Sequence, residues 1–340
     1  MLNRMGSAFF SYEACFKRCA EMLTKPYVSR LVKTAYRRGH SAQHRKIMSW
    51  ARRFYGVERV SVHRRFWSKW LMDFVVQAQI DIFRSDRLAA VELGAAGIGM
   101  GDLRIHCSTG DINSSIVYLM GFSDNMTYFR IYRMFARPNS IAVDVGANLG
   151  IHTLVLADCV SRGTVFSFEP RRSAYARMID NLMENGITNV AASDQALGDA
   201  IGVGCLLVDE NDFNIGKSHL GEQGGQAVEV TTLDDALKNS SSAVSLIKID
   251  TEGYELQVLR GASRTLTDHK PVIVCEFTPS AYSFCDLKHL VPYRARHFRI
   301  PQTFYEKLEP VHDDHAHPCD LLIVPEDRLT REVQDMLVSL

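Results

Sequence analysis

Short runs of apolar and β-branched residues recur along the second half of the chain. They read SIAVDV, TVFSF, VSLIKID, PVIVCEF and DLLIVP, at residues 140–145, 164–168, 244–250, 271–277 and 320–325. Patterns with helical spacing separate most of these runs, and Asn185 with Gly186 has the sequence of a helix stop. This alternation predicts an α/β fold with a doubly wound, mostly parallel sheet and helices on both faces.

The first quarter of the chain has a different pattern. Residues 8–25 and 64–83 place aromatic and aliphatic side chains at three- and four-residue steps with basic residues between them, which predicts amphipathic helices. The glycine-rich stretch 89–101 is the best candidate for a boundary. We therefore predict a basic, mainly helical extension over residues 1–100 and a second domain over residues 101–340.

The zero net charge of the 340-residue chain conceals an asymmetry. The first 70 residues hold 16 Lys and Arg against 3 Asp and Glu, which leaves 23 against 36 in the remainder. A helical subdomain with a solvated basic face explains this charge, and so does contact of residues 1–90 with an anionic membrane surface, which basic helices with interfacial aromatics suit. No nucleic-acid partner is expected, because no recognition motif accompanies the charge.

The location of the protein follows from features that the sequence lacks. It has no run of about 18 apolar residues and no pattern of a secretory signal. Its eight cysteines include no CxxC pair, which favours reduced thiols. We expect a cytoplasmic protein, peripheral at the membrane if the basic extension binds lipid.

A glycine turn follows the first apolar run. In DVGANLG, residues 144–150, Gly146 and Gly150 remove side chains where a strand turns into a helix, so that a ligand can approach the backbone and the amide-rich helix start. Asn148 stands where the dinucleotide fingerprint has its second glycine. The turn suits a nucleotide-like ligand and argues against a nicotinamide cofactor.

Acidic residues follow several predicted strands. Glu169 comes 23 residues after Gly146, and an acid about 20 residues beyond such a turn is placed to accept ribose hydroxyls. Asp250 and Glu276 follow two further strands and should reach the same carboxyl edge as Asp144. Since like charges repel, four carboxylates at one crevice point to a bound cation.

Seven segments together resemble the FkbM family of S-adenosylmethionine-dependent methyltransferases. They read VDVGANLGIHT, FSFEP, NLMENGITNV, ALGD, TTLDDAL, IKIDTEGYELQVLRGA and DLLIVP, in this order, between about Ser108 and Pro325. The most specific is IKIDTEGYELQVLRGA. The resemblance implies a class I methyltransferase fold, a Rossmann-like seven-stranded sheet with an antiparallel last strand, and methylation of hydroxyl groups on sugars or natural products.

The resemblance also implies roles for individual residues. Glu169 would hold the ribose, Gln195 and Ala196 would approach the adenine, and Asp250 and Glu252 would lie beside the reacting centre. The methionine end of the cofactor would be lined by Asp144, Gly146, Asn148 and Gly150.

Methyl transfer to a hydroxyl group needs close in-line approach, and a nearby base helps the proton to leave. Asp250, Glu252 and Glu276 are the candidate catalytic residues, and His152 and His219 are weaker ones. For Glu255 we favour a structural role, since an acid in a first helical turn stabilises the helix dipole.

Residues 312–317, HDDHAH, precede Cys319 and include ligand types for a metal. Solvated loop residues explain them equally, and sulfonium methyl transfer requires no metal, so none is expected. The sequence therefore favours an O-methyltransferase that uses S-adenosylmethionine. A nicotinamide-dependent oxidoreductase and a non-catalytic scaffold that keeps the methyltransferase fold stay open as alternatives.

Overall fold

The computed structural model describes residues 87–91, 103–107, 126–208, 218–221, 225–300 and most of 308–329. The predicted amphipathic helices at residues 8–25 and 64–83 lie outside the described residues. The boundary at residue 100 stays a prediction, and strand β1 (Arg87–Val91) lies within the stretch predicted to be mainly helical.

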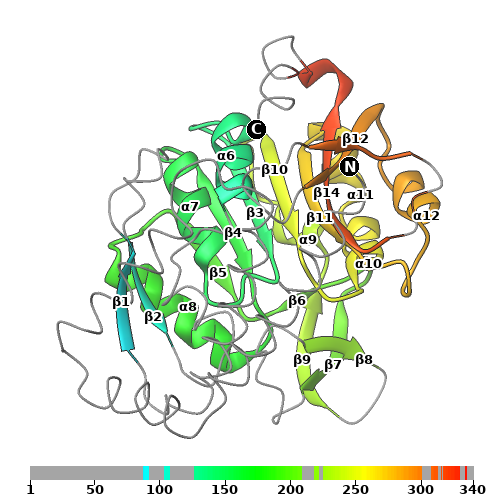
Figure 1. The fold of residues 1–340 in the computed structure, drawn as a ribbon. Helices are drawn as coiled ribbons and strands as arrows, with labels where there is room; N and C mark the ends of the chain where they lie inside the picture. The colour runs from blue at the N-terminus through cyan, green and yellow to red at the C-terminus, as the bar shows by residue number, and fades with distance from the viewer. Residues whose placement is uncertain are drawn as a thin grey trace, which may run out of the picture. The chain divides into compact units, whose positions relative to one another are not determined.

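A large mixed sheet forms the centre of the fold (Figure 1). Its strands are, in spatial order, β13 (Glu309–Pro310), β12 (Ala295–Ile300), β14 (Cys319–Pro325), β11 (Val272–Phe277), β10 (Val244–Ile249), β3 (Ile141–Val145), β4 (Thr164–Phe168) and β5 (Val190–Ser193). The strands from β5 to β11 pair in parallel, and β14 pairs antiparallel with both β11 and β12.

The predicted doubly wound, mostly parallel α/β fold is thus confirmed, and each of the five apolar runs coincides with one strand to within a residue or two. The strand order agrees with the seven-stranded sheet and antiparallel last strand that were expected. The two-residue β13 extends this sheet to eight strands at its edge.

Side chains alternate along the strands and so divide the core into two layers. Helices α6 (Met126–Phe135), α7 (Ile151–Cys159) and α8 (Arg172–Glu184) pack on the face that carries Ala142, Leu246 and Val274. The opposite face carries Val143, Ile247 and Ile273. It is covered by helices α9 (Leu233–Ala236), α10 (Glu255–Arg260), α11 (Ser263–His269) and α12 (Phe284–His289).

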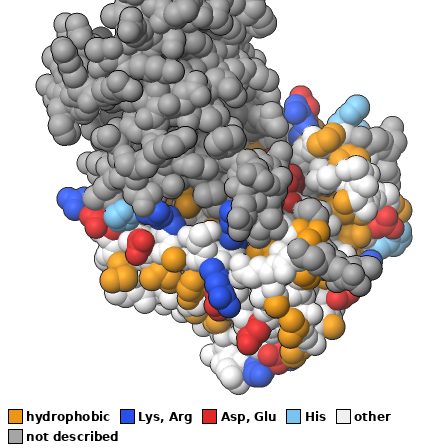
Figure 2. Space-filling view, turned by 90° about the horizontal axis from the view of Figure 1, so that it is seen from below, with side chains coloured by type: hydrophobic (Ala, Val, Ile, Leu, Met, Phe, Trp, Pro, Cys, Tyr) orange, Lys and Arg blue, Asp and Glu red, His pale blue; other side chains and the backbone are white. Residues whose placement is uncertain are grey.

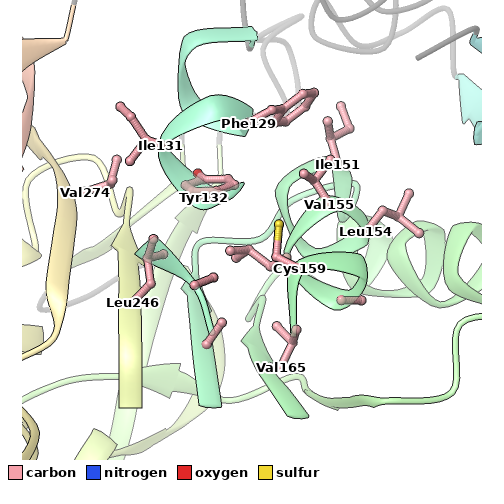
Figure 3. Close-up of a cluster of buried hydrophobic side chains, with 14 of the residues drawn as sticks. Phe129, Ile131, Tyr132, Ile151, Leu154, Val155, Cys159, Val165, Leu246 and Val274 are labelled. Atoms are coloured by element: carbon pink, nitrogen blue, oxygen red, sulfur yellow. The ribbon is translucent and has the colours of Figure 1, made fainter. Parts of the chain in front are cut away.

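Helix α6 is tied to the sheet by apolar packing. Figure 3 shows Phe129 and Tyr132 of α6 beside Ile151 and Val155 of α7, above Leu246 of β10. Phe129 and Tyr132 are fully buried, and burial of such a side chain stabilises a fold by about 1.5–3 kcal/mol. This packing fixes α6 against the carboxyl edge of the sheet.

The predicted helix stop is confirmed at the end of α8. Asn185 caps the helix, and Gly186 follows with a φ of +64°. Gly186 N donates to Met183 O and Ile187 N donates to Leu182 O, which is the arrangement that terminates many helices at a left-handed glycine.

Two smaller sheets were not predicted. A hairpin of β1 and β2 (Leu103–Cys107) docks on α8, where Asn185 bonds both the N–H and the carbonyl of Arg104. A four-stranded sheet in the order β6 (Ala196–Leu197), β9 (Gln226–Thr231), β7 (Gly202–Val208), β8 (Ser218–Gly221) interrupts the chain between β5 and β10. In Figure 2, acidic, basic and hydrophobic side chains are interspersed over the described part of the visible face.

None of the helices in the described part of the chain has the length and hydropathy to cross a membrane.

Candidate active site

The turn between β3 and α7 is built on three left-handed residues. Gly146, Asn148 and Gly150 have φ values of +71°, +50° and +79°. A Cβ at Gly146 would lie 1.8 Å from the carbonyl oxygen of Asp250, so only glycine allows this close approach. The amides of Gly146 and Ala147 both donate to Phe168 O at 3.0 Å. The turn is therefore held between the ends of β4 and β10.

Glu169 lies directly after β4 and contacts this turn. Its Oε2 accepts a hydrogen bond from the amide of Asn148 at 2.8 Å, and its Oε1 accepts one from the amide of Arg171 at 2.9 Å. The side chain is buried, and burial raises the pKa of Glu169 although both amide bonds oppose this shift. The structure thus brings together the predicted ribose ligand and the glycine turn.

Asp144 and Asp250 meet at a lysine that the sequence analysis did not single out. Lys248 is the direct neighbour of Asp144 in the pairing of β10 with β3. Its Nζ lies 3.2 Å from Asp144 Oδ1 and 3.4 Å from Asp250 Oδ2, and it donates to Gly146 O at 2.8 Å. Thr153 Oγ1 donates to Asp144 Oδ2 at 2.6 Å, whereas the buried Oδ1 has the ion pair with Lys248 and no hydrogen bond among the described residues.

Burial lowers the pKa of Lys248, but the carboxylates of Asp144 and Asp250 outweigh this effect and the net shift is upward. The ammonium group is therefore charged, and it neutralises much of the acid set. This corrects the argument that the convergence of acids by itself requires a bound cation, since the chain supplies one. Asp250 differs from Asp144 in access, because its side chain is 51% exposed whereas that of Asp144 is buried.

Glu255, the first residue of α10, organises the loop after β10. It is fully buried, and its Oε1 accepts hydrogen bonds from Thr251 N, Thr251 Oγ1 and Gly253 N. These contacts support the structural role that we favoured for Glu255. Its hydrogen bonds to the loop amides, rather than an interaction with the helix dipole, explain this role. The neighbouring Glu252 is exposed and has a φ of +54°, so the loop turns it away from the core.

Glu276 lies near the end of β11, directly opposite Asp320 of β14. Burial raises the pKa of Glu276 to about 8, with further contributions from Asp250, Glu252, Glu255 and Asp320. Glu276 Oε2 is buried and has no hydrogen-bond partner among the described residues.

Asp320, which lies opposite Glu276, is hydrogen-bonded to helix α6. Tyr128 Oη donates to Asp320 Oδ2 at 2.5 Å. Burial raises the pKa of Asp320 to about 6, while the hydrogen bond from Tyr128 and the charge of Lys248 oppose the rise. Asp320, Glu276 and Asp250 thus form a cluster of carboxyl groups at the carboxyl edge of the sheet.

His152, a weaker candidate, lies in α7 among aromatic rings of α6. Its Nδ1 lies 2.8 Å from Tyr132 Oη, and the rings of Tyr128, Phe129 and Tyr132 contact its ring edge to face. Burial and then the charge of Lys248 lower its pKa to about 4. His152 is therefore neutral near pH 7, and its contacts support packing rather than catalysis.

Gln195 and Ala196 lie just beyond β5, next to Glu169. The amide of Glu169 donates to Ser193 O at 3.0 Å, and Gln195 N donates to Ser193 Oγ at 3.2 Å. Gln195 Nε2 also donates to Glu229 Oε2, while Ala196 is buried. Their role on the adenine side of the cofactor stays a prediction.

Two other histidine predictions have different outcomes. The side chain of His219 lies outside the described residues.

In the HDDHAH segment, His315 Nε2 lies 3.2 Å from Cys319 Sγ and the ring contacts Phe277 and Phe284. Within the described part of the chain, no group of three or more His, Cys, Asp or Glu is arranged to hold a metal ion.

Sequence reasoning missed Lys248, Asp320 and the two tyrosines of α6. Lys248 interrupts an otherwise apolar strand, and a charge inside a buried strand needs a partner, which was a usable signal. Asp320 is the first residue of the last apolar run, and Glu276 is near the end of the run before it. Because the last strand was expected to be antiparallel, these two ends could have been placed at the same edge of the sheet. Nothing local in the sequence marks Tyr128 and Tyr132, because only the packing of α6 brings them here.

Comparison with known proteins shows similarity to methyltransferases. Residues 144–309 match the family model described as the methyltransferase FkbM domain. The hexuronic acid methyltransferase AglP of Haloferax volcanii is 25% identical over 149 residues, which cover 41% of this chain and 56% of that protein. The match thus spans little more than half of that relative.

Two further proteins are similar to this chain. Methyltransferase 1 of Beauveria bassiana is 27% identical over 175 residues, which cover 45% of this chain and 70% of that protein. Among solved structures, the methyltransferase FkbM from Methylobacillus flagellatus KT shares 17% identity and a TM-score of 0.38, over 63% of this chain and 53% of the other.

Proposed function

Because residues 144–309 form a methyltransferase FkbM domain, we propose that the protein transfers a methyl group from S-adenosylmethionine to a hydroxyl group of a sugar, glycolipid or natural product. The observation that carries this proposal is the contact of the glycine turn with acids from three strand ends. Asp144 and Asp250 meet at Lys248, and Glu169 bonds the amide of Asn148. The acceptor class draws support from AglP, which is named as a hexuronic acid methyltransferase.

The residues at this edge fit S-adenosylmethionine. Gly146 and Gly150 expose backbone at the start of α7, where amide groups bind polar ligands. Each oxygen of Glu169 accepts one amide bond, and an ionised carboxylate has about four acceptor sites, so it can still accept two ribose hydroxyls. The half-exposed carboxylate of Asp250 suits the positive charge of the cofactor.

The chemistry that the cofactor supplies is an electrophilic methyl group on a positively charged sulfur. The chain's own task is to hold that group and the acceptor in line and to exclude water. Lys248 fixes Asp144, Asp250 and Gly146 O in one arrangement. Helix α6 closes this side of the sheet with Tyr128 and Tyr132, which bond Asp320 and His152.

A direct test incubates the protein with S-adenosylmethionine carrying an isotopically labelled methyl group and an extract supplemented with neutral sugars and hexuronic acids. Mass spectrometry should find the label on a hydroxyl oxygen of one acceptor. The proposal is wrong if the label appears only on nitrogen or carbon, or if no label leaves the cofactor. Reduction of a nicotinamide cofactor in a parallel sample would favour the oxidoreductase alternative.

We also propose that residues 1–90, of which the structure describes only the start of β1, bind an anionic membrane surface and make the protein peripheral there. The support is the excess of basic over acidic residues in this segment. Sedimentation with vesicles should show binding to phosphatidylserine-containing vesicles that weakens with salt. Equal binding to neutral phosphatidylcholine vesicles would contradict the electrostatic part of this proposal.

A further inference from the structure

Two carboxyl groups face each other at the edge of the sheet beside Asp250. Asp320 of β14 is paired directly with Glu276 of β11, and residues paired in this way have Cβ atoms about 4.5–5.5 Å apart on the same face. That face is the one covered by α6, because Tyr128 of α6 donates to Asp320. Asp250 follows directly after Ile249, which pairs with Cys275, so it is the neighbour of Glu276 on the other side.

The surroundings of the two groups differ. Asp320 has a hydrogen-bond donor, Tyr128, at 2.5 Å and the positive charge of Lys248 nearby, both of which favour its ionised form. Glu276 has no such donor on its buried Oε2, and the charged groups that act on it are the acids Asp250, Glu252, Glu255 and Asp320. On the side of Asp320 away from Glu276, β12 places the apolar Ile300.

These surroundings separate the two titrations. The pKa of Asp320 is raised by burial only to about 6, whereas burial and four nearby acids raise that of Glu276 to about 8. Between these values the pair holds one proton, with Asp320 ionised and Glu276 neutral. The shared proton lies on Glu276, because Tyr128 and Lys248 favour the ionised form of Asp320 only.

Methyl transfer to an alcohol forms an O–C bond and breaks the S–C bond, with the electron pair of that bond passing to sulfur. The hydroxyl proton must leave, and a base that receives it typically contributes about 10²–10⁴-fold. The base must be ionised and accessible near neutral pH. Asp320 is partly exposed and ionised near neutral pH, so it can accept a proton. A neutral Glu276 carries a carboxyl proton and can donate a hydrogen bond instead.

We propose that Asp320 receives the proton of the acceptor hydroxyl, that Tyr128 positions Asp320, and that Glu276 holds the acceptor by donating a hydrogen bond to it. This inference rests on the proposed transfer to a hydroxyl group. It assigns the base to a residue outside the sequence-based set of Asp250, Glu252 and Glu276. Glu276 as a residue is only partly buried, so the acceptor would meet its accessible side rather than the buried Oε2.

The first test needs no cofactor. In ¹³C NMR of the carboxyl carbons of the free protein, Asp320 should titrate near pH 6 and Glu276 near pH 8. Tyr128→Phe should move the Asp320 titration upward, because a hydrogen bond to the ionised form is lost. Glu276→Gln should leave the Asp320 titration near pH 6, because Glu276 is already neutral at that pH. Tyr293→Phe is the matched control, since it removes a hydroxyl that bonds Pro271 O at the opposite edge of the sheet.

The second test uses the active protein. Asp320→Asn should lower kcat by about 10²–10⁴-fold with little change in the affinity for S-adenosylmethionine. Tyr128→Phe should shift the acid limb of the pH–rate profile upward, which loss of packing alone would not do. An Asp320→Asn variant with wild-type kcat, or an Asp320 that titrates together with Glu276, would overturn the inference. A wild-type protein that methylates no hydroxyl would instead refute the proposed function and remove the basis for this assignment.

Discussion

Lys248 and Asp144 form a buried ion pair at the centre of the candidate site. The two residues are neighbours in the pairing of β10 with β3, and Lys248 Nζ lies 3.2 Å from Asp144 Oδ1. Their side chains are 5% and 0% exposed. Lys248 also reaches Asp250 and the carbonyl of Gly146, so this one side chain joins the glycine turn to the loop after β10.

Removal of the lysine should be strongly destabilising. Lys248→Met leaves Asp144 buried without its cation, and breaking a buried pair in this way costs about 3–5 kcal/mol in the free energy of unfolding. Urea denaturation measures this loss. In the double variant Lys248→Met, Asp144→Asn the loss should be smaller, because no uncompensated charge remains.

The matched control is Lys238→Met, which removes the exposed partner of Asp235. An exposed pair contributes about 0–1 kcal/mol, so this variant should be close to wild type. If Lys248→Met were as stable as Lys238→Met, the ion pair would not hold the site together.

Two left-handed glycines allow the close approach at Gly146 to be separated from backbone strain. Gly146→Ala and Gly186→Ala both place a Cβ on a residue with positive φ, at +71° and +64°. At Gly186 nothing lies within 4 Å, so we expect a loss of about 1–2 kcal/mol. At Gly146 the Cβ would lie 1.8 Å from Asp250 O, so the loop after β10 must move.

Thermal unfolding of both variants, together with binding of S-adenosylmethionine, tests this difference. Gly186→Ala should bind the cofactor as wild type does, whereas Gly146→Ala should be less stable and bind it weakly or not at all. Equal stability and equal binding of the two variants would show that the contact between the turn and Asp250 is unimportant.

The pH dependence of His152 should be unusual. Its pKa in the folded protein is about 4, below the ordinary value of 6.5, because the ring is buried beside Lys248. A depressed pKa contributes stability above pH 6.5 that is lost as the pH falls from 6.5 to 4, since the unfolded chain binds the proton first. NMR of the imidazole protons should give a midpoint near pH 4. A midpoint near 6.5 would contradict the burial that the structure assigns to this ring.

Much of the fold could be predicted because it depends on local patterns. The apolar runs marked the five strands, and Gly146 and Glu169 marked the ends of β3 and β4 at one edge. Side chains two residues apart on a strand lie on the same face, so Lys248 could have been assigned to the face of Leu246. The apolar residues around Lys248 make this alternation hard to recognise in the sequence.

The rest depends on contacts between distant segments. The bond from Tyr128 to Asp320 joins residues 192 positions apart, and no local spacing encodes it. The four-stranded sheet that begins at β6 is short and half-exposed, so its strands lack the continuous apolar signal of the central ones. The positions of the acids could be predicted from the strand ends. The net charge of the site could not, because it depends on the ion pairs that Lys248 forms with Asp144 and Asp250.

The central claim is that this edge of the sheet binds S-adenosylmethionine, and titration calorimetry with the 340-residue chain tests it most directly. Wild-type protein should bind S-adenosylmethionine and show no heat with NAD. Glu169→Ala should lose most of the affinity, whereas Glu309→Ala, which removes an exposed acid of the edge strand β13, should retain it. Absence of binding to the wild-type protein, or equal affinity of the two variants, would contradict the account.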